Sequence, residues 1–218
     1  MISLDNRLKT AAALCRSGGI VCDVGTDHAL LACYLAKNGA KEVIASDIND
    51  GPLEAARRTV EQEGCNNVRV VKSDGLHEID YADDVIICGM GGELIADIIA
   101  GCRFLSEDTR FILQPMTKPE ILRERLYADG FEILEERTAY DGKRTYVIML
   151  AAYTGDRLDI DELFAFTGKV TDAEFLRLTA EKLIKNARGM ESSESFGKEA
   201  QKLRSLAEKI LKKAEELA

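Results

Sequence analysis

The sequence predicts a doubly wound α/β fold whose parallel sheet ends in an antiparallel hairpin, followed by a C-terminal antiparallel pair of helices. Short apolar runs alternate with helical segments across short links, which is typical of a parallel sheet covered on both faces. Asp141 and Gly142 alone then separate two strand-like runs, and an Asp-Gly link of this length predicts a tight hairpin turn. After Gly155, apolar residues recur at helical spacing.

The parallel part of the sheet is expected to hold five strands. An amphipathic helix at residues 4–14 precedes them and ends before Gly18 and Gly19, because glycine favours helix ends. The expected strands are 20–24, 42–46, 68–71, 85–88 and 111–113, and the expected helices between and after them are 28–38, 51–62, 92–100 and 118–128.

The pattern changes after the fifth strand. The hairpin strands are expected at 131–140 and 143–153, and two long helices at 171–188 and 196–217, joined by a polar connector at 189–195. We therefore expect a Rossmann-like domain at 1–155 and a helical, coiled-coil-like domain at 156–218. A lid or a dimer contact is the alternative role for these helices, and both a monomer and a homodimer stay open.

Composition and charge limit the function classes. The 218 residues carry a net charge of −9, which argues against a protein that coats nucleic acid by bulk attraction. Residues 161–218 hold 11 basic and 11 acidic residues, so the whole excess of acid lies in residues 1–160. Six cysteines without a CxxC pair and only two histidines make a metal site improbable. Without a signal peptide or membrane span, the expected location is cytoplasmic.

Polar and small residues stand where the first four strands end. In an open α/β sheet, ligands bind beyond the carboxyl ends of the strands, where these residues should converge. The candidates for cofactor binding are Asp23, Gly25, Thr26, Asp27 and His28 at the first strand, Asp47 and Ile48 at the second, Asp74 and Gly75 at the third, and Gly89 at the fourth.

The first turn favours a cationic ligand over a dinucleotide. It carries one glycine, Gly25, in place of the G-x-G-x-x-G pattern, and Asp27 at the head of the helix would repel a pyrophosphate. The ammonium and sulfonium groups of S-adenosylmethionine suit such a site. Asp47 is placed to accept hydrogen bonds from both ribose hydroxyls, and Asp74 is placed to accept one from an adenine amine. A helix N-cap is the alternative role for Asp27.

The glycine-rich segment after the fourth strand should lie beside the donor methyl group. Gly89, Met90 and Gly91 would let another molecule approach closely, although a tight strand-to-helix turn is the alternative. His28 could contact substrate, or it could bond to backbone at the helix start. Gln114 could hydrogen-bond a base edge.

These motifs resemble one known family. Asp23-Val24-Gly25-Thr26-Asp27-His28-Ala29, Asp50-Gly51-Pro52, Asp74-Gly75-Leu76, Gly89-Met90-Gly91-Gly92, Ile112-Leu113-Gln114-Pro115 and Arg7-Leu8 are similar to the bacterial tRNA (adenine-N1)-methyltransferases, the TrmK family. The resemblance implies a Rossmann-like class I fold, S-adenosylmethionine as cofactor, and methylation of N1 of adenine 22 in the tRNA D-arm. The family pattern has Tyr and Asn where this chain has Leu30 and Met116.

The resemblance also suggests which residues act in catalysis and which bind the substrate. Asp27 would stabilise the cationic methylated adenine. The backbone carbonyls of Gly89 and Met90 would accept hydrogen bonds from the exocyclic amine of that adenine. These three residues are the catalytic candidates. The substrate-binding candidates are Arg7, His28, Gly91, Gln114, Lys182, Lys185 and Arg188. A solvated helix face is the alternative for the last three. The competing functions are methylation of a small molecule or protein, and cofactor binding without turnover.

Overall fold

The computed structural model describes residues 2–142, 144–190 and 197–217. The chain divides into two compact units, residues 1–159 and 160–218. Each unit is described by itself.

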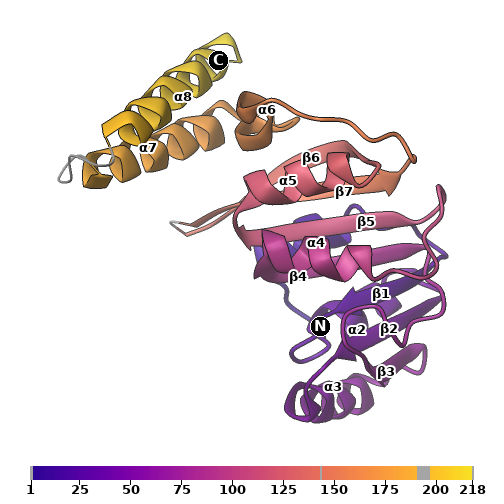
Figure 1. Ribbon diagram of the computed structural model, residues 1–218. Helices are drawn as coiled ribbons and strands as arrows, with labels where there is room; N and C mark the ends of the chain where they lie inside the picture. The colour runs from indigo at the N-terminus through magenta and orange to yellow at the C-terminus, as the bar shows by residue number, and fades with distance from the viewer. Residues whose placement is uncertain (1, 143, 191–196, 218) are drawn as a thin grey trace. The chain divides into compact units, whose positions relative to one another are not determined.

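The first unit is built on one seven-stranded sheet with the strand order β3-β2-β1-β4-β5-β7-β6 (Figure 1). Strands β1 to β5 pair in parallel, whereas β7 runs antiparallel to both β5 and β6. This confirms the predicted parallel sheet that ends in an antiparallel hairpin. The strands are β1 Ile20–Val24, β2 Glu42–Asp47, β3 Val68–Lys72, β4 Asp84–Gly91, β5 Arg110–Thr117, β6 Phe131–Asp141 and β7 Arg144–Tyr153.

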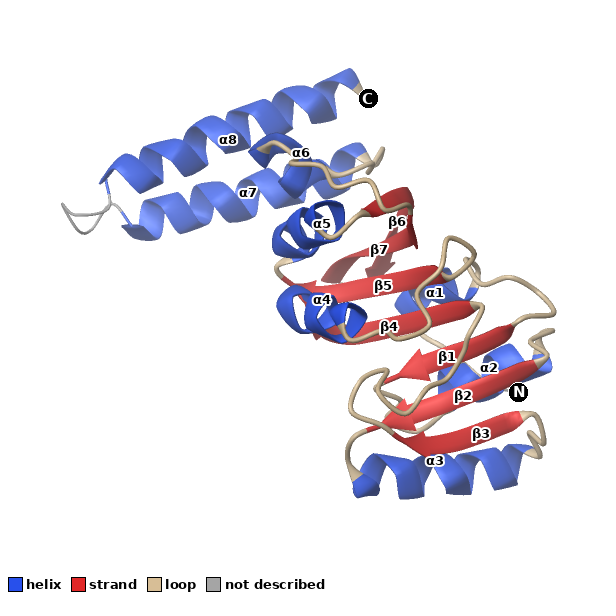
Figure 2. Ribbon diagram, turned by 45° about the vertical axis from the view of Figure 1, so that its right-hand side comes forward, coloured by secondary structure: helices blue, strands red, loops and turns tan. Residues whose placement is uncertain are grey.

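Helices cover both faces of the sheet. Helix α4 packs against α5 over one face, while α1 and α2 lie behind the sheet in the same view (Figure 2). The central strands are consequently mostly apolar, and Val21, Ile86 and Ile112 are fully buried. The helices are α1 Asn6–Ala12, α2 Leu30–Lys37, α3 Asp50–Glu63, α4 Gly92–Ala100 and α5 Pro119–Ala128.

Two strands are longer than predicted. The fifth was expected to end at Leu113, but β5 continues through Gln114 and Pro115 to Thr117. The segment from Gly89 to Gly91 was expected to follow the fourth strand, but it forms the end of β4, and α4 begins at Gly92. The register between β4 and β5 shifts around Gly89, whose φ of +87° accommodates an extra residue. The strand therefore continues through a bulge.

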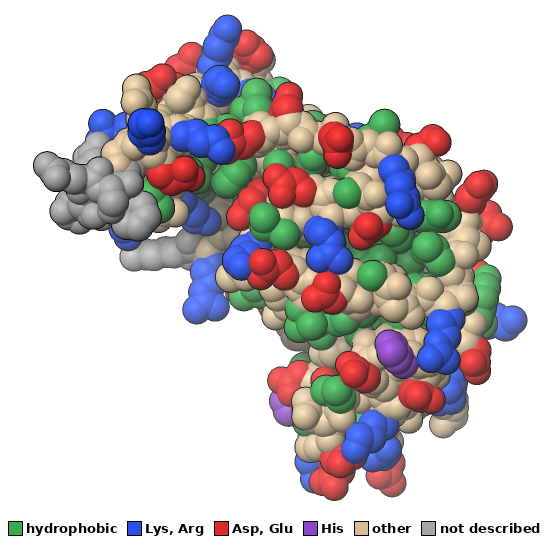
Figure 3. All heavy atoms as spheres, in the orientation of Figure 1, with side chains coloured by type: hydrophobic (Ala, Val, Ile, Leu, Met, Phe, Trp, Pro, Cys, Tyr) green, Lys and Arg blue, Asp and Glu red, His purple; other side chains and the backbone are tan. Residues whose placement is uncertain are grey.

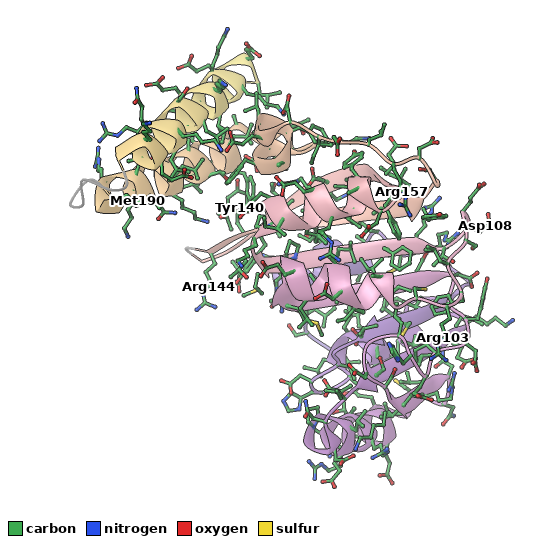
Figure 4. The ribbon with its side chains drawn as sticks, in the orientation of Figure 1. Arg103, Asp108, Tyr140, Arg144, Arg157 and Met190 are labelled. Carbon is green, nitrogen blue, oxygen red and sulfur yellow. The ribbon has the colours of Figure 1, made fainter. Side chains whose placement is uncertain are left out.

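The β6–β7 hairpin extends farther than its pairing with β5. Strand β7 pairs with β5 from Ala152 back to Met149. Its pairing with β6 continues from there to Arg144. Tyr140 and Arg144 lie near the end of this hairpin (Figure 4). The side-chain amide of Asn6 on α1 donates to the Tyr140 carbonyl at 2.9 Å, which ties α1 to the hairpin.

Among its described residues, the second unit contains three helices: α6 Glu162–Thr167, α7 Ala173–Met190 and α8 Gly197–Glu216. The two long helices were predicted and pack against each other. Helix α6 was not predicted, although Asp161 provides a clear N-cap by accepting from the Phe164 amide at 2.7 Å. Lys213 on α8 donates to the Thr167 hydroxyl at 2.8 Å and so holds α6 in place. Of the predicted connector, residues 189–190 belong to α7, and 191–195 lie outside the described residues.

Acidic and basic side chains are interspersed on the face of the first unit shown in Figure 3. The excess of acid in the sequence therefore forms no continuous acidic field on that face. No helix within the described ranges is long and apolar enough to cross a membrane.

Candidate active site

A pocket of about 350 Å³ opens at the carboxyl ends of β1 and β4. Most of the residues predicted at the first strand line it, together with Arg7 and Gly89. The lining residues are Arg7, Leu8, Asp23, Gly25, Thr26, Asp27, His28, Ala29, Leu30, Leu31, Cys88 and Gly89. The pocket lies at the edge of the sheet where a doubly wound fold is expected to bind its ligand.

The turn after β1 shapes the floor of this pocket. The Gly25 and Thr26 amides both donate to the Ser46 carbonyl of β2, at 2.8 and 2.9 Å. Gly25 has a φ of +78°, and a Cβ atom there would stand 2.2 Å from the Met90 methyl carbon. Glycine is favoured here by the backbone conformation, while the Met90 methyl group is the end of a flexible side chain that could move aside.

Asp23 is a buried carboxyl group in the pocket wall. Its residue is only 5% exposed, and burial raises the pKa of this carboxyl to about 6, against the opposing effect of a hydrogen bond from the Thr26 hydroxyl. Burying a charge without a cation is costly, so a positively charged ligand would favour the ionised form. Asp23 is therefore suited to a cationic partner.

Asp27 and His28 face solvent at the mouth of the same pocket. Their side chains are 79% and 59% exposed, and the His28 Nε2 lies 3.4 Å from an Asp27 carboxylate oxygen. Helix α2 has Ala29 as its N-cap, in the left-handed region at a φ of 52°, and receives no side-chain capping bond. The Asp27 carboxylate is thus not used as a helix cap in this structure, which leaves it facing the pocket.

The candidates from the second and third strands lie along the same edge without lining this pocket. Asp47 accepts from the Asn49 amide at 2.8 Å, and its carbonyl accepts from the Ser73 amide at 3.0 Å, so the ends of β2 and β3 are joined. Ile48 and Asp74 are exposed beside them. Gly75 has a φ of +58° and packs against a helix side chain, which a side chain of its own would displace.

Gln114 is connected to the pocket through two residues that line it. Its side-chain oxygen accepts from Arg7 Nη1 at 2.7 Å and from the Gly89 amide at 3.1 Å. Met90 and Gly91 continue β4 beyond Gly89.

Lys182, Lys185 and Arg188 are exposed on α7, in the other unit. Because the two units are described separately, these three residues are not assigned to this pocket.

Sequence reasoning missed several apolar residues of the pocket. Leu8, Ala29, Leu31 and Cys88 line it but were not among the candidates, and Leu30 was noted only as a departure from a family pattern. Leu8, Ala29 and Cys88 are adjacent in sequence to a candidate, and Leu30 and Leu31 lie within three residues of His28, so proximity in sequence was the available signal. Burial raises the pKa of the Cys88 thiol to about 12, so it is neutral at physiological pH and packs as a small apolar group.

Over residues 2–142, 144–190 and 197–217, no group of three or more His, Cys, Asp or Glu is arranged to hold a metal ion. The six cysteines are free thiols.

Two comparisons decide the family. Residues 4–149 match the family model described as a methyltransferase domain. The tRNA (adenine(22)-N(1))-methyltransferase of Bacillus subtilis strain 168 is 36% identical over 195 residues, which cover 84% of this chain and 82% of that protein. The chain belongs to the tRNA (adenine(22)-N(1))-methyltransferase family. The resemblance inferred from its motifs is confirmed.

Solved structures of the family match this methyltransferase along almost its whole length. The crystal structure of the B. subtilis M1A22 tRNA methyltransferase TrmK is 30% identical with a TM-score of 0.82, covering 100% of this chain and 99% of that one. Streptococcus pneumoniae Sp1610, a putative tRNA (m1A22) methyltransferase in complex with S-adenosyl-L-methionine, is 28% identical with a TM-score of 0.80, covering 97% and 100%. The predicted cofactor, S-adenosylmethionine, and the methyltransferase fold are thereby confirmed.

The residues of the pocket fit this cofactor. Asp23 offers a buried carboxyl group to a cation, and Gly25 leaves the turn open to a close approach. Asp47 stands at the end of the neighbouring strand β2, where it could accept from hydroxyl groups.

Proposed function

We propose that this methyltransferase transfers the methyl group of S-adenosylmethionine to N1 of adenine 22 in the D-arm of tRNA. The observation that carries the proposal is the pocket at the ends of β1 and β4, in a chain of this family, with a buried carboxyl group at Asp23 and an exposed one at Asp27. The free thiols support a cytoplasmic location, because disulfides are rare in that compartment.

The residues of the chain bind and orient the cofactor and the adenine, and no step requires a general base. When bound, S-adenosylmethionine supplies a methyl group on a positively charged sulfur. The N1 lone pair of the adenine forms the new N–C bond, and the electron pair of the broken C–S bond returns to sulfur as a neutral thioether. Most of the rate enhancement then comes from holding N1 in line with the methyl group.

The positive charge moves from sulfur to the adenine ring during transfer. Asp27, which lines the pocket with an exposed carboxylate, is proposed to stabilise that charge once bound RNA shields it from water. The backbone carbonyls of Gly89 and Met90 are proposed to accept from the exocyclic amine. Asp23, Gly25, Thr26, His28, Asp47, Ile48, Asp74 and Gly75 are proposed to hold the cofactor.

The tRNA body is proposed to bind the exposed cations of α7. Lys182, Lys185 and Arg188 follow one another at intervals of three residues, so they share one side of the helix. Two lysines of α8 are used differently, because Lys202 pairs with Glu162 at 3.1 Å and Lys213 bonds to α6.

The proposal is tested by incubating the protein with labelled S-adenosylmethionine and unmodified bulk tRNA, followed by nucleoside analysis. We expect label in 1-methyladenosine. Label in protein or in a small molecule, with none in tRNA, would refute the proposal and favour the competing methyltransferase functions.

A further inference from the structure

The side chain of Gln114 uses its whole amide group inside the protein. It is fully buried on β5, and its oxygen accepts from Arg7 Nη1 at 2.7 Å and from the Gly89 amide at 3.1 Å. Its nitrogen donates to the Pro115 carbonyl at 2.9 Å and contacts the Met116 sulfur at 3.5 Å. The amide is therefore fixed in one orientation, with no group left to reach a substrate base.

The Gly89 amide belongs to the extra residue of the β4 bulge. In the register, Cys88 faces Gln114 and Met90 faces Pro115, so Gly89 has no partner of its own on β5. A bulge leaves the extra residue unpaired in the strand ladder, and the Gln114 oxygen supplies the missing acceptor. Since Gly89 also lines the pocket, this bond holds pocket backbone in place.

Arg7, on α1, contacts both Gln114 and the bulge. A Cβ atom on Gly89 would stand 3.6 Å from Arg7 Nη1, so the guanidinium lies directly over the bulge. The guanidinium carbon is 5.8 Å from the centre of the Tyr146 ring on β7, and Asp5 lies 3.4 Å from Nη2. The neighbouring Asn6 is bonded to the β6–β7 hairpin at Tyr140 (Figure 4). Arg7 is thus held on several sides.

We infer that Arg7 and Gln114 are positioning residues that together hold the Gly89 bulge against the pocket, and that neither contacts the tRNA base directly. This replaces the direct base contact expected for Gln114 from the sequence. The inference rests on the proposed function, because the bulge is positioned for the methyl acceptor. Loosening it should slow methyl transfer more than it weakens tRNA binding, since small misplacements of reacting groups can cost about 100-fold in rate.

Two variants of Gln114 separate the effect of its hydrogen-bond acceptor from the effect of its side-chain length. Gln114→Met keeps the length and removes both the oxygen that accepts from Arg7 and Gly89 and the nitrogen that donates to the Pro115 carbonyl, whereas Gln114→Glu keeps the acceptor and loses only that donor. We expect Gln114→Met to lower kcat by about tenfold or more with KM for tRNA unchanged, and Gln114→Glu to lose clearly less activity than Gln114→Met. Arg7→Met should lower kcat similarly, and the double variant should be no worse than either single one, because both act through one contact.

Direct base recognition predicts the opposite pattern. If Arg7→Met raised KM for tRNA while Gln114→Met changed nothing, or if the two effects simply added in the double variant, the inference would be wrong. These outcomes also cover the case in which Gln114→Met fails to fold, since Arg7→Met and Gln114→Glu can still be measured.

Hydrogen exchange at the Gly89 amide tests the same contact without any substrate. Although Gly89 is exposed, we expect its amide to exchange slowly in the unmodified protein and about tenfold faster or more in Gln114→Met, with Ile86 and Ile87 unchanged. An unchanged Gly89 rate would overturn the inference. Faster exchange in a protein that methylates no tRNA would refute the proposed function alone.

Discussion

The raised pKa of Asp23 predicts that cofactor affinity depends on pH. Binding a cation requires the ionised carboxylate, and with a pKa of about 6 this form is a minor species at pH 5 and the major one at pH 7. The affinity for S-adenosylmethionine should therefore be about tenfold higher at pH 7 than at pH 5. At pH 6, binding should release about half a proton for each site filled.

The same shift predicts an effect on stability in the absence of cofactor. The folded-state pKa lies above the ordinary value of 3.8 for an aspartate carboxyl, so between about pH 4 and pH 6 the folded state binds more protons than the unfolded state. The contribution of Asp23 to stability is consequently lost as pH rises through this window, by at most about 3 kcal/mol. Asp23→Asn should be more stable than the unmodified protein at pH 7, yet bind the cofactor more weakly.

Calorimetry at pH 5, 6 and 7, in two buffers that differ in ionisation enthalpy, measures both the affinity and the protons released. The Asp23→Asn variant is the control, because the pH dependence assigned to the Asp23 carboxyl should be lost in it. An affinity equal at pH 5 and pH 7, or an identical pH dependence in Asp23→Asn, would refute the reasoning.

Three further substitutions test other parts of the account. Asp27→Asn should lower methyl transfer by about 100-fold without changing the melting temperature, because the side chain is exposed and caps no helix. Reversing the charge of Lys182 and Lys185 to Glu should weaken tRNA binding and make the slope of log affinity against log salt shallower by about 1 to 2, measured by filter binding at several salt concentrations. Arg123→Met should reduce the free energy of unfolding by about 3–5 kcal/mol, measured in urea, because it leaves the fully buried Glu136 carboxylate without its 2.8 Å partner.

Two of these variants have a matched control. Reversing the charge of the exposed Arg57 and Arg58 on α3 changes the net charge equally, so an equal loss of tRNA affinity would show a bulk charge effect. Replacing Arg123 and Glu136 together by Met and Leu should recover most of the lost stability. Full turnover in Asp27→Asn would remove that residue from its proposed role.

The fold was largely predictable from the sequence because its signals are local. Apolar runs ending in polar or glycine residues located the parallel strands, and Asp141-Gly142 located the hairpin. The β4 bulge was not predictable, because the glycines from Gly89 to Gly91 are equally typical of a loop. What keeps Gly89 in the strand is the hydrogen bond that its amide donates to a residue 25 positions away, and such a contact leaves no local pattern.

The candidate site was predictable to a similar extent. Residues at strand ends, such as Asp23 and Gly25, were found because the topology of the sheet brings strand ends together. The apolar lining was missed, since Leu8 and Leu31 are ordinary helix residues in sequence. That Asp27 caps no helix was also beyond sequence reasoning, because it depends on the left-handed conformation of Ala29.

The central claim is methylation of one adenine at N1, and a pair of tRNA transcripts tests it most directly. The two transcripts are identical except for guanine in place of adenine at position 22, and reverse transcription, which stops at 1-methyladenosine, maps the product. The account predicts a stop at position 22 in the first transcript after incubation with S-adenosylmethionine, and no transfer to the second. Equal transfer to both transcripts, or a stop at another position, would contradict it.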